Sequence, residues 1–186
     1  MKTIQITALN LVLLFCASCA YFSTPLKPAD KPNHKSAILF GRFNLIKNNQ
    51  DGFKLGLWLQ NTQTGKSHYF SFLEDQPLYG VPVTPGKYRV VGFVCSNREH
   101  EIKSRNRFPQ IGLAELIGRP FEAASATAVY IGDYTGEATY DSLTAHWQVK
   151  SATNNYVTTT REFRGKYQQL IFMPAVSIFK PHPGEF

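Results

Sequence analysis

From residue 36 onward, short apolar runs alternate with clusters of Gly, Pro, Asn and Asp, a pattern typical of β-strands joined by turns. Residues 53–60 show it best, because successive side chains of a strand point to opposite faces. One face of this strand carries only large apolar side chains, those of Phe53, Leu55, Leu57 and Leu59. The other face is mixed and carries Lys54, Gly56, Trp58 and Gln60. We therefore expect the leucine face to lie against the core.

The same pattern predicts further strands at residues 37–46, 66–73, 78–83, 87–95, 126–136, 138–149 and 170–179. The strand at 87–95 is apolar on both faces, which indicates a central strand with Cys95 as a buried free thiol. Pro174 interrupts the last run and makes it an edge strand or a bulged one.

Two of these segments carry more specific expectations. The run at 126–136 contains the letters GDYTG, and we expect a sharp turn there, begun by Asp133. In the run at 138–149, alternation predicts that Leu143, Trp147 and Val149 face the core.

One helix is predicted over residues 154–170, because apolar side chains recur there at spacings of seven, four and three residues. They belong to Tyr156, Phe163, Tyr167 and Leu170. Asn154 or Asn155 is suited to cap the start of this helix. About seven or eight short strands followed by one C-terminal helix predict a mainly β fold, an antiparallel β-sandwich with the helix packed on it.

The N-terminus has the three-part order of a secretory leader: a positive Lys2, an apolar stretch and then small residues. The letters CASC, which end at Cys19, resemble the lipobox of bacterial lipoproteins, although Cys16 stands where an aliphatic residue is usual. The resemblance implies that Cys19 is acylated and anchors the chain to a membrane. Cleavage after Ala20, which would release a soluble periplasmic or secreted protein, is the alternative.

The leader divides the chain into three parts: residues 1–19 with the lipobox, 20–35 as a tether and 36–186 as the folded domain. Residues 20–35 are rich in Pro and Lys, so we expect an extended, solvated tether. If the lipobox resemblance holds in a Gram-negative cell, Ala20 after the lipidated cysteine implies sorting to the outer membrane.

Two further segments carry a resemblance. Residues 83–93, VTPGKYRVVGF, resemble the turn and strand of prealbumin-like and carboxypeptidase-regulatory-like sandwich domains. Residues 129–136, VYIGDYTG, are similar to a strand and turn of small proteobacterial lipoproteins. Together they imply a β-sandwich in a cell envelope, and they imply no reaction.

The net charge of +7 falls to +6 once Lys2 leaves with the leader, because 19 basic and 13 acidic residues remain. The basic residues are scattered except for Arg98, Lys103, Arg105 and Arg107, which share a segment with two Glu. This segment is a possible binding loop for anionic groups, but a solvated loop is the simpler explanation. We expect no nucleic-acid partner.

No motif in the chain indicates catalysis or cofactor binding. GxSxG, GxxxxGK[ST] and GxGxxG are absent, and the five His contain no short-spaced pair, so we expect no metal and no cofactor. His68 falls on the inward face with Phe70, where a packed histidine is the simplest reading. A hydrolase would have to assemble dispersed residues such as His146 and Asp141.

Trp58 is the candidate recognition residue, because it projects opposite the leucine face, between Lys54 and Gln60. The ring either is exposed and stacks on a sugar or a partner, or is covered by the helix or a loop. We expect a non-catalytic envelope lipoprotein, structural or interaction-based, whose partners are the membrane and an envelope protein or polysaccharide. A small secreted hydrolase is the alternative.

Overall fold

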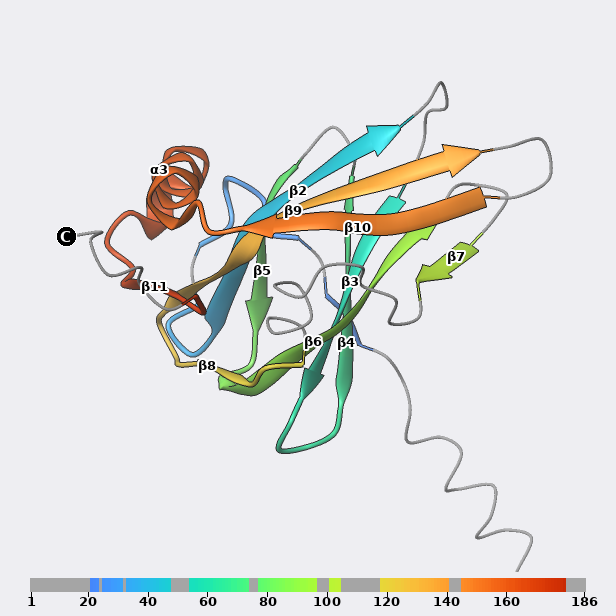
Figure 1. Ribbon diagram of the computed structural model, residues 1–186. Helices are drawn as coiled ribbons and strands as arrows, with labels where there is room; N and C mark the ends of the chain where they lie inside the picture. Colours follow the sequence, from blue (N-terminus) through green and yellow to red (C-terminus); the bar gives the residue numbers. More distant parts are fainter. Residues whose placement is uncertain are drawn as a thin grey trace, which may run out of the picture.

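The computed structural model describes residues 21–23, 25–31, 33–47, 54–73, 77–96, 101–104, 118–140 and 145–179. It confirms a mainly β chain, in which two sheets are accompanied by one α-helix among the described residues (Figure 1). Sheet A contains, in spatial order, β1 (Tyr21–Ser23), β4 (Ser67–Leu73), β3 (Lys54–Asn61), β6 (Gly86–Ser96) and β7 (Glu101–Ser104), with β8 (Phe121–Ala123) also paired to β6. Sheet B contains β10 (Ala145–Thr153), β9 (Ala128–Tyr140), β2 (Ala37–Lys47) and β5 (Leu78–Val83), with β11 (Ala175–Ser177) also paired to β9.

Both sheets are mixed rather than antiparallel throughout. β2 and β11 each pair with β9 in parallel, and β1 pairs with β4 in parallel. The described residues form eleven strands, more than the seven or eight expected. Three of them, β1, β8 and β11, have only three residues each, too few to show an alternating pattern.

Apolar side chains from both sheets meet in one core. Leu57 and Leu59 of β3 are buried there, which confirms the face that alternation predicted. Phe93 of β6 joins the sheets, because its ring centre lies 5.7 Å from that of Phe43 and 4.8 Å from that of Tyr134. Each such side chain contributes about 1.5–3 kcal/mol by leaving water.

The helix α3 (Tyr156–Lys166) and the short 3-10 helix η2 (Gln168–Leu170) cover the other face of sheet B (Figure 1). The ring of Phe163 stacks on that of Phe40, with centres 4.3 Å apart. Gly80 makes this approach possible, because a Cβ there would come within 2.7 Å of the Phe163 ring. Tyr167 and Leu170 are buried in the same cluster, so the predicted helical face is confirmed, although α3 itself ends at Lys166.

The predicted turn at Asp133 is wrong, because β9 continues straight through it. Gly132, at a φ of +120°, forms a bulge opposite Gly41 instead of a turn. The two backbones approach so closely that a Cβ on Gly41 would lie 2.4 Å from the carbonyl oxygen of Gly132. Asp133 therefore stays within the sheet, beside α3.

The strand predicted at 138–149 is divided between two elements. Its first residues complete β9, and β10 begins at Ala145. Val149 is buried, as predicted. Leu143 and the side chain of Trp147 lie outside the described part of the chain.

Part of the segment expected to be a tether contacts the domain. Besides the pairing of β1 with β4, the backbone N–H of Leu26 donates to the carbonyl oxygen of Gly80 at 2.7 Å, and the Leu26 side chain is buried. Residues 27–31 and 33–35 are exposed, as a solvated segment would be. Leu26 thus packs on the fold although Pro25 precedes it and Pro28 follows.

Candidate functional site

Trp58 lies on the outer face of sheet A and is half-buried. Its ring centre is 5.0 Å from that of Tyr69 on β4. Tyr69 lies over Gly56, where an added Cβ would come within 2.3 Å of the tyrosine ring. On the other side, Trp58 is paired with Gly92 of β6, where a Cβ would meet open space. Gly56 thus makes room for the Tyr69 ring, whereas a side chain at Gly92 would meet neither ring.

The helix does not cover this face. α3 contacts β2, β5 and β9, all of which belong to sheet B. Cover of the Trp58 ring by the helix is therefore wrong, while cover by a loop and exposure for binding both stay predictions. We call Trp58, Tyr69, Gln60 and Arg89 the aromatic face.

Polar groups lie next to the ring pair. Gln60 Oε1 accepts hydrogen bonds from Nε of Arg89 at 3.1 Å and from its Nη2 at 2.6 Å. Arg89 is exposed, so this pair presents amide and guanidinium groups to solvent beside the rings. Tyr69 and Arg89 were missed by the sequence reasoning, although the inward His68 and Phe70 already implied that Tyr69 points outward.

The remaining predicted site residues are less well defined. Lys54 belongs to β3 and Lys103 to β7, but their side chains lie outside the described part of the chain. Arg98, Arg105, Arg107 and Cys19 lie outside the described residues altogether. The side chains of Cys95 and His146 and all of Asp141 do so as well.

His68 packs among aromatic rings, as the packed-histidine reading expected. Its ring centre lies 6.4 Å from that of Phe70 and 5.8 Å from that of Tyr88. Burial lowers the pKa of His68 below its ordinary value of 6.5, and the nearby charge of Lys66 lowers it further.

This shift predicts a pH dependence of stability. Because the folded chain holds the proton less tightly than the unfolded chain, the His68 contribution is present above pH 6.5 and is lost as the pH falls through the lowered pKa. The free energy of unfolding, measured by urea titration between pH 7.5 and pH 5, should fall less steeply in His68→Gln than in the parent chain. An equal fall of the free energy of unfolding with pH in the two chains would show that His68 has the same pKa in the folded and the unfolded state.

The buried carboxylate of Asp133 joins sheet B to α3. Its Oδ2 accepts hydrogen bonds from Oγ1 of Thr159 at 2.8 Å and from Nδ2 of Asn155 at 3.2 Å. Asn155 occupies the N-cap position, and α3 has no acidic residue in its first turn. Asp133 therefore supplies the negative charge that a helix N-terminus favours. The partners of this acid are a hydroxyl and an amide, which assigns it a structural role.

Burial also raises the pKa of Tyr130 and Tyr134 well above the ordinary value. Both phenols stay protonated and donate to backbone carbonyls, Tyr130 to Thr153 and Tyr134 to Ile131. The Tyr130 bond ties β9 to β10, the Tyr134 bond lies within β9, and the protonated phenols provide no base or nucleophile.

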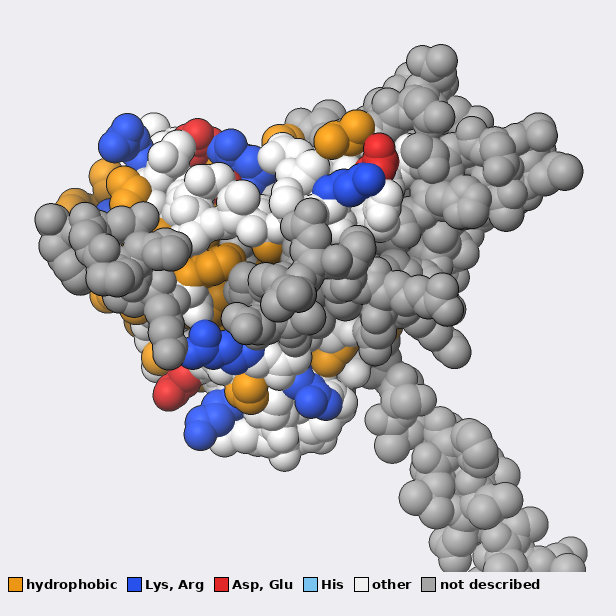
Figure 2. Space-filling view, in the orientation of Figure 1, with side chains coloured by type: hydrophobic (Ala, Val, Ile, Leu, Met, Phe, Trp, Pro, Cys, Tyr) orange, Lys and Arg blue, Asp and Glu red, His pale blue; other side chains and the backbone are white. Residues whose placement is uncertain are grey.

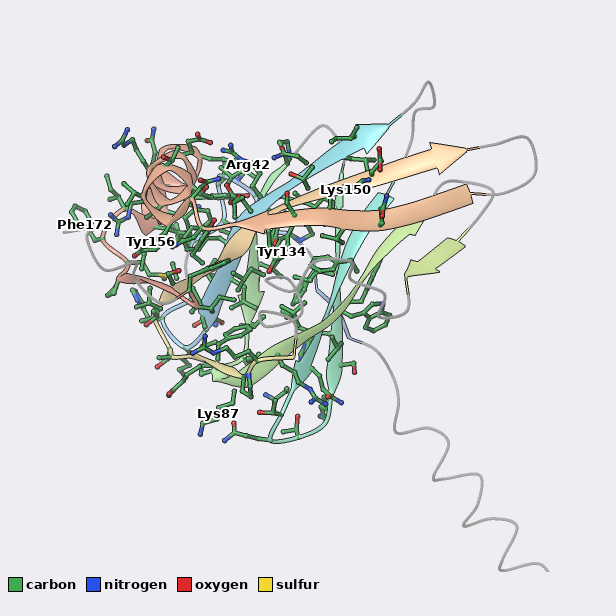
Figure 3. All side chains as sticks on the ribbon, viewed as in Figure 1. Arg42, Lys87, Tyr134, Lys150, Tyr156 and Phe172 are labelled. Atoms are coloured by element: carbon green, nitrogen blue, oxygen red, sulfur yellow. The ribbon has the colours of Figure 1, made fainter. Side chains whose placement is uncertain are left out.

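A groove of about 890 Å³ lies along α3, and the sequence reasoning missed it. Its lining includes Tyr156, Val157, Thr160, Arg161, Arg164 and Ile171. We call it the α3 groove. The groove forms because Ile171, which follows η2, lies close to the helix. No local pattern in the sequence indicates this contact. Figure 3 shows Tyr156 on the side of α3 toward β11, and its hydroxyl donates to the carbonyl oxygen of Ala175 at 2.6 Å.

Within the described part of the chain, no group of three or more His, Cys, Asp or Glu is arranged to hold a metal ion. Nor does any helix there have the length and apolar character needed to cross a membrane. No family model, curated protein or solved structure was found to match the chain.

Proposed function

We propose that the chain is a non-catalytic lipoprotein of the cell envelope, anchored through Cys19, that holds an envelope protein or polysaccharide at its aromatic face. The single observation that carries this proposal is that α3 packs on sheet B, so that the helix does not cover the Trp58–Tyr69 pair on the outer face of sheet A. Large aromatic rings beside hydrogen-bonding groups are the usual composition of a recognition surface.

The position of β1 supports a role close to the membrane. β1 begins at Tyr21, two residues after Cys19, a separation of about 7 Å at most in an extended chain. β1 also pairs with β4, which carries Tyr69, so the aromatic face lies two strands from the proposed anchor. A lipid on Cys19 would therefore hold this face near the membrane surface, where the outer membrane is the expected location.

The proposal also concerns how the two sheets pack against each other. With one core shared by both sheets, we infer a β-sandwich of the kind that the PGKYRV turn and strand resembles. Gly86 begins β6, and the Tyr88 hydroxyl donates to the carbonyl oxygen of Thr84 at 2.6 Å, which closes this turn.

Lipidation should depend on one cysteine. Incorporation of labelled palmitate should be lost in Cys19→Ala and retained in Cys16→Ala, because only Cys19 follows small residues as a lipobox requires. Label that persists in Cys19→Ala would rule out the anchor but leave the aromatic face untested, so the two parts of the proposal fail separately.

A crosslinking pulldown of the native lipoprotein tests the recognition role. The parent chain should capture a defined envelope component, protein or polysaccharide, and Trp58→Ala should lose it. Val176→Ala is the matched control, because Val176 is 45% exposed and lies on β11 of sheet B, outside the aromatic face. Capture that is equal in all three chains would overturn the assignment of the aromatic face.

A further inference from the structure

The α3 groove is a candidate binding site that does not depend on the aromatic face. One wall is α3, and the other includes Ile171, just after η2. Its volume of about 890 Å³ falls within the range of small-molecule sites. Figure 3 shows Phe172 projecting outward beside it. The groove therefore has the size of a ligand site and an open, apolar edge.

The charged side chains that line the groove are all basic. Arg161 is exposed and has no ion-pair partner among the described residues, and Arg164 donates to the carbonyl oxygen of Met173 at 3.3 Å. The only acid of α3, Glu162, forms an ion pair with Arg42 of β2. Figure 2 shows separate basic side chains around the helix, with an acidic one among them. The groove thus attracts an anionic group.

Apolar side chains continue the surface on either side of the arginines. Val157 is 65% exposed, Ile171 is 50% exposed and the neighbouring Phe172 is 94% exposed. Adjacent large apolar side chains at such exposure are a feature of binding surfaces. An apolar portion of a ligand would cover them.

Thr160 provides the third observation. The residue is only 8% exposed, its Oγ1 has no hydrogen-bond partner among the described residues, and it lines the groove. A buried hydroxyl without a partner is costly, and such groups are rare unless a ligand or water completes them. The Oγ1 atom itself is shielded from solvent, so it would donate to an anionic oxygen between the arginines once the Thr160 side chain turns toward the groove.

We propose that the α3 groove binds, as a single molecule from solution, an amphiphile with one anionic head group and one acyl chain. The head group lies between Arg161 and Arg164, and it accepts a hydrogen bond from Thr160 Oγ1 once that side chain has turned toward the groove. The chain lies along Val157 and Ile171. Neither the apolar walls nor the arginines alone would select this ligand, because each recognises only one end of it.

Calorimetric titration tests the ligand class. The full chain carrying Cys19→Ala, which is purified without detergent, is titrated with decanoate below its micelle concentration. Decanoate should bind, while decanol, which lacks the charge, and acetate, which lacks the chain, should bind at least tenfold more weakly. Decanol binding as tight as decanoate would overturn the proposal, as would binding only to vesicles that contain phosphatidylglycerol, because that result would mean docking on a bilayer.

Variants locate the site. Arg161→Gln combined with Arg164→Gln should weaken decanoate binding about tenfold. Gly165→Leu should block it, since Gly165 lines the groove where an added Cβ meets open space, and Leu suits a helix better than Gly. Arg119→Gln is the matched charge control and should bind as the parent does, because Arg119 is exposed and lies outside both the α3 groove and the aromatic face. Thermal melting verifies that each variant is folded; unchanged decanoate affinity in both groove variants would overturn the proposal.

Discussion

Replacing Phe163 with Ala should lower the free energy of unfolding by about 3–5 kcal/mol, because it removes the main contact between α3 and sheet B and leaves a cavity. The Phe163 ring is 1% exposed and stacks on Phe40. Urea denaturation followed by circular dichroism measures the change. The loss would be a large share of the 5–15 kcal/mol that stabilises an ordinary domain.

Val157→Ala is the matched control for this truncation. Val157 lies on the same helix, but it is 65% exposed, so the free energy of unfolding should stay within about 0.5 kcal/mol of the parent value. Similar losses in both variants would contradict the orientation of α3 on the sheet.

Asp133→Ala should cost about 3 kcal/mol, because two hydrogen bonds to a buried carboxylate are lost and their donors are left without an acceptor. Thr159 and Asn155 supply those donors. Asp133→Asn should cost less, since an amide oxygen still accepts from Thr159 while the charge beside the helix N-terminus is gone. In urea denaturation, the free energy of unfolding should be highest for the parent chain, lower for Asp133→Asn and lowest for Asp133→Ala. An unchanged free energy of unfolding in Asp133→Ala would mean that the acid does not anchor α3.

Local patterns predicted the parts of the fold that local physics decides. The alternation in β3 placed Leu57 and Leu59 in the core, and the spacing of Phe163, Tyr167 and Leu170 placed one face of the helix. Both follow from the fixed periods of strand and helix.

Long-range contacts decided the rest. The letters GD are typical of a turn, but β2 on one side and α3 on the other hold Asp133 in an extended strand. Alternation also carries no information about which strands pair, so the parallel pairing of β2 with β9 was missed. The same distinction applies to the two candidate sites. Trp58 could be identified from the alternation of its own strand, whereas the α3 groove depends on a long-range contact, the approach of Ile171 to the helix.

Thermal and urea unfolding of Trp58→Ala tests the central claim most directly. If the Trp58 ring serves recognition on an open face, its removal should cost only about 1–2 kcal/mol, because a half-buried side chain loses less burial than a core ring. The variant should then melt close to the parent while it loses its envelope partner. A loss as large as the 3–5 kcal/mol expected for Phe163→Ala would show that the ring is structural and would contradict the account.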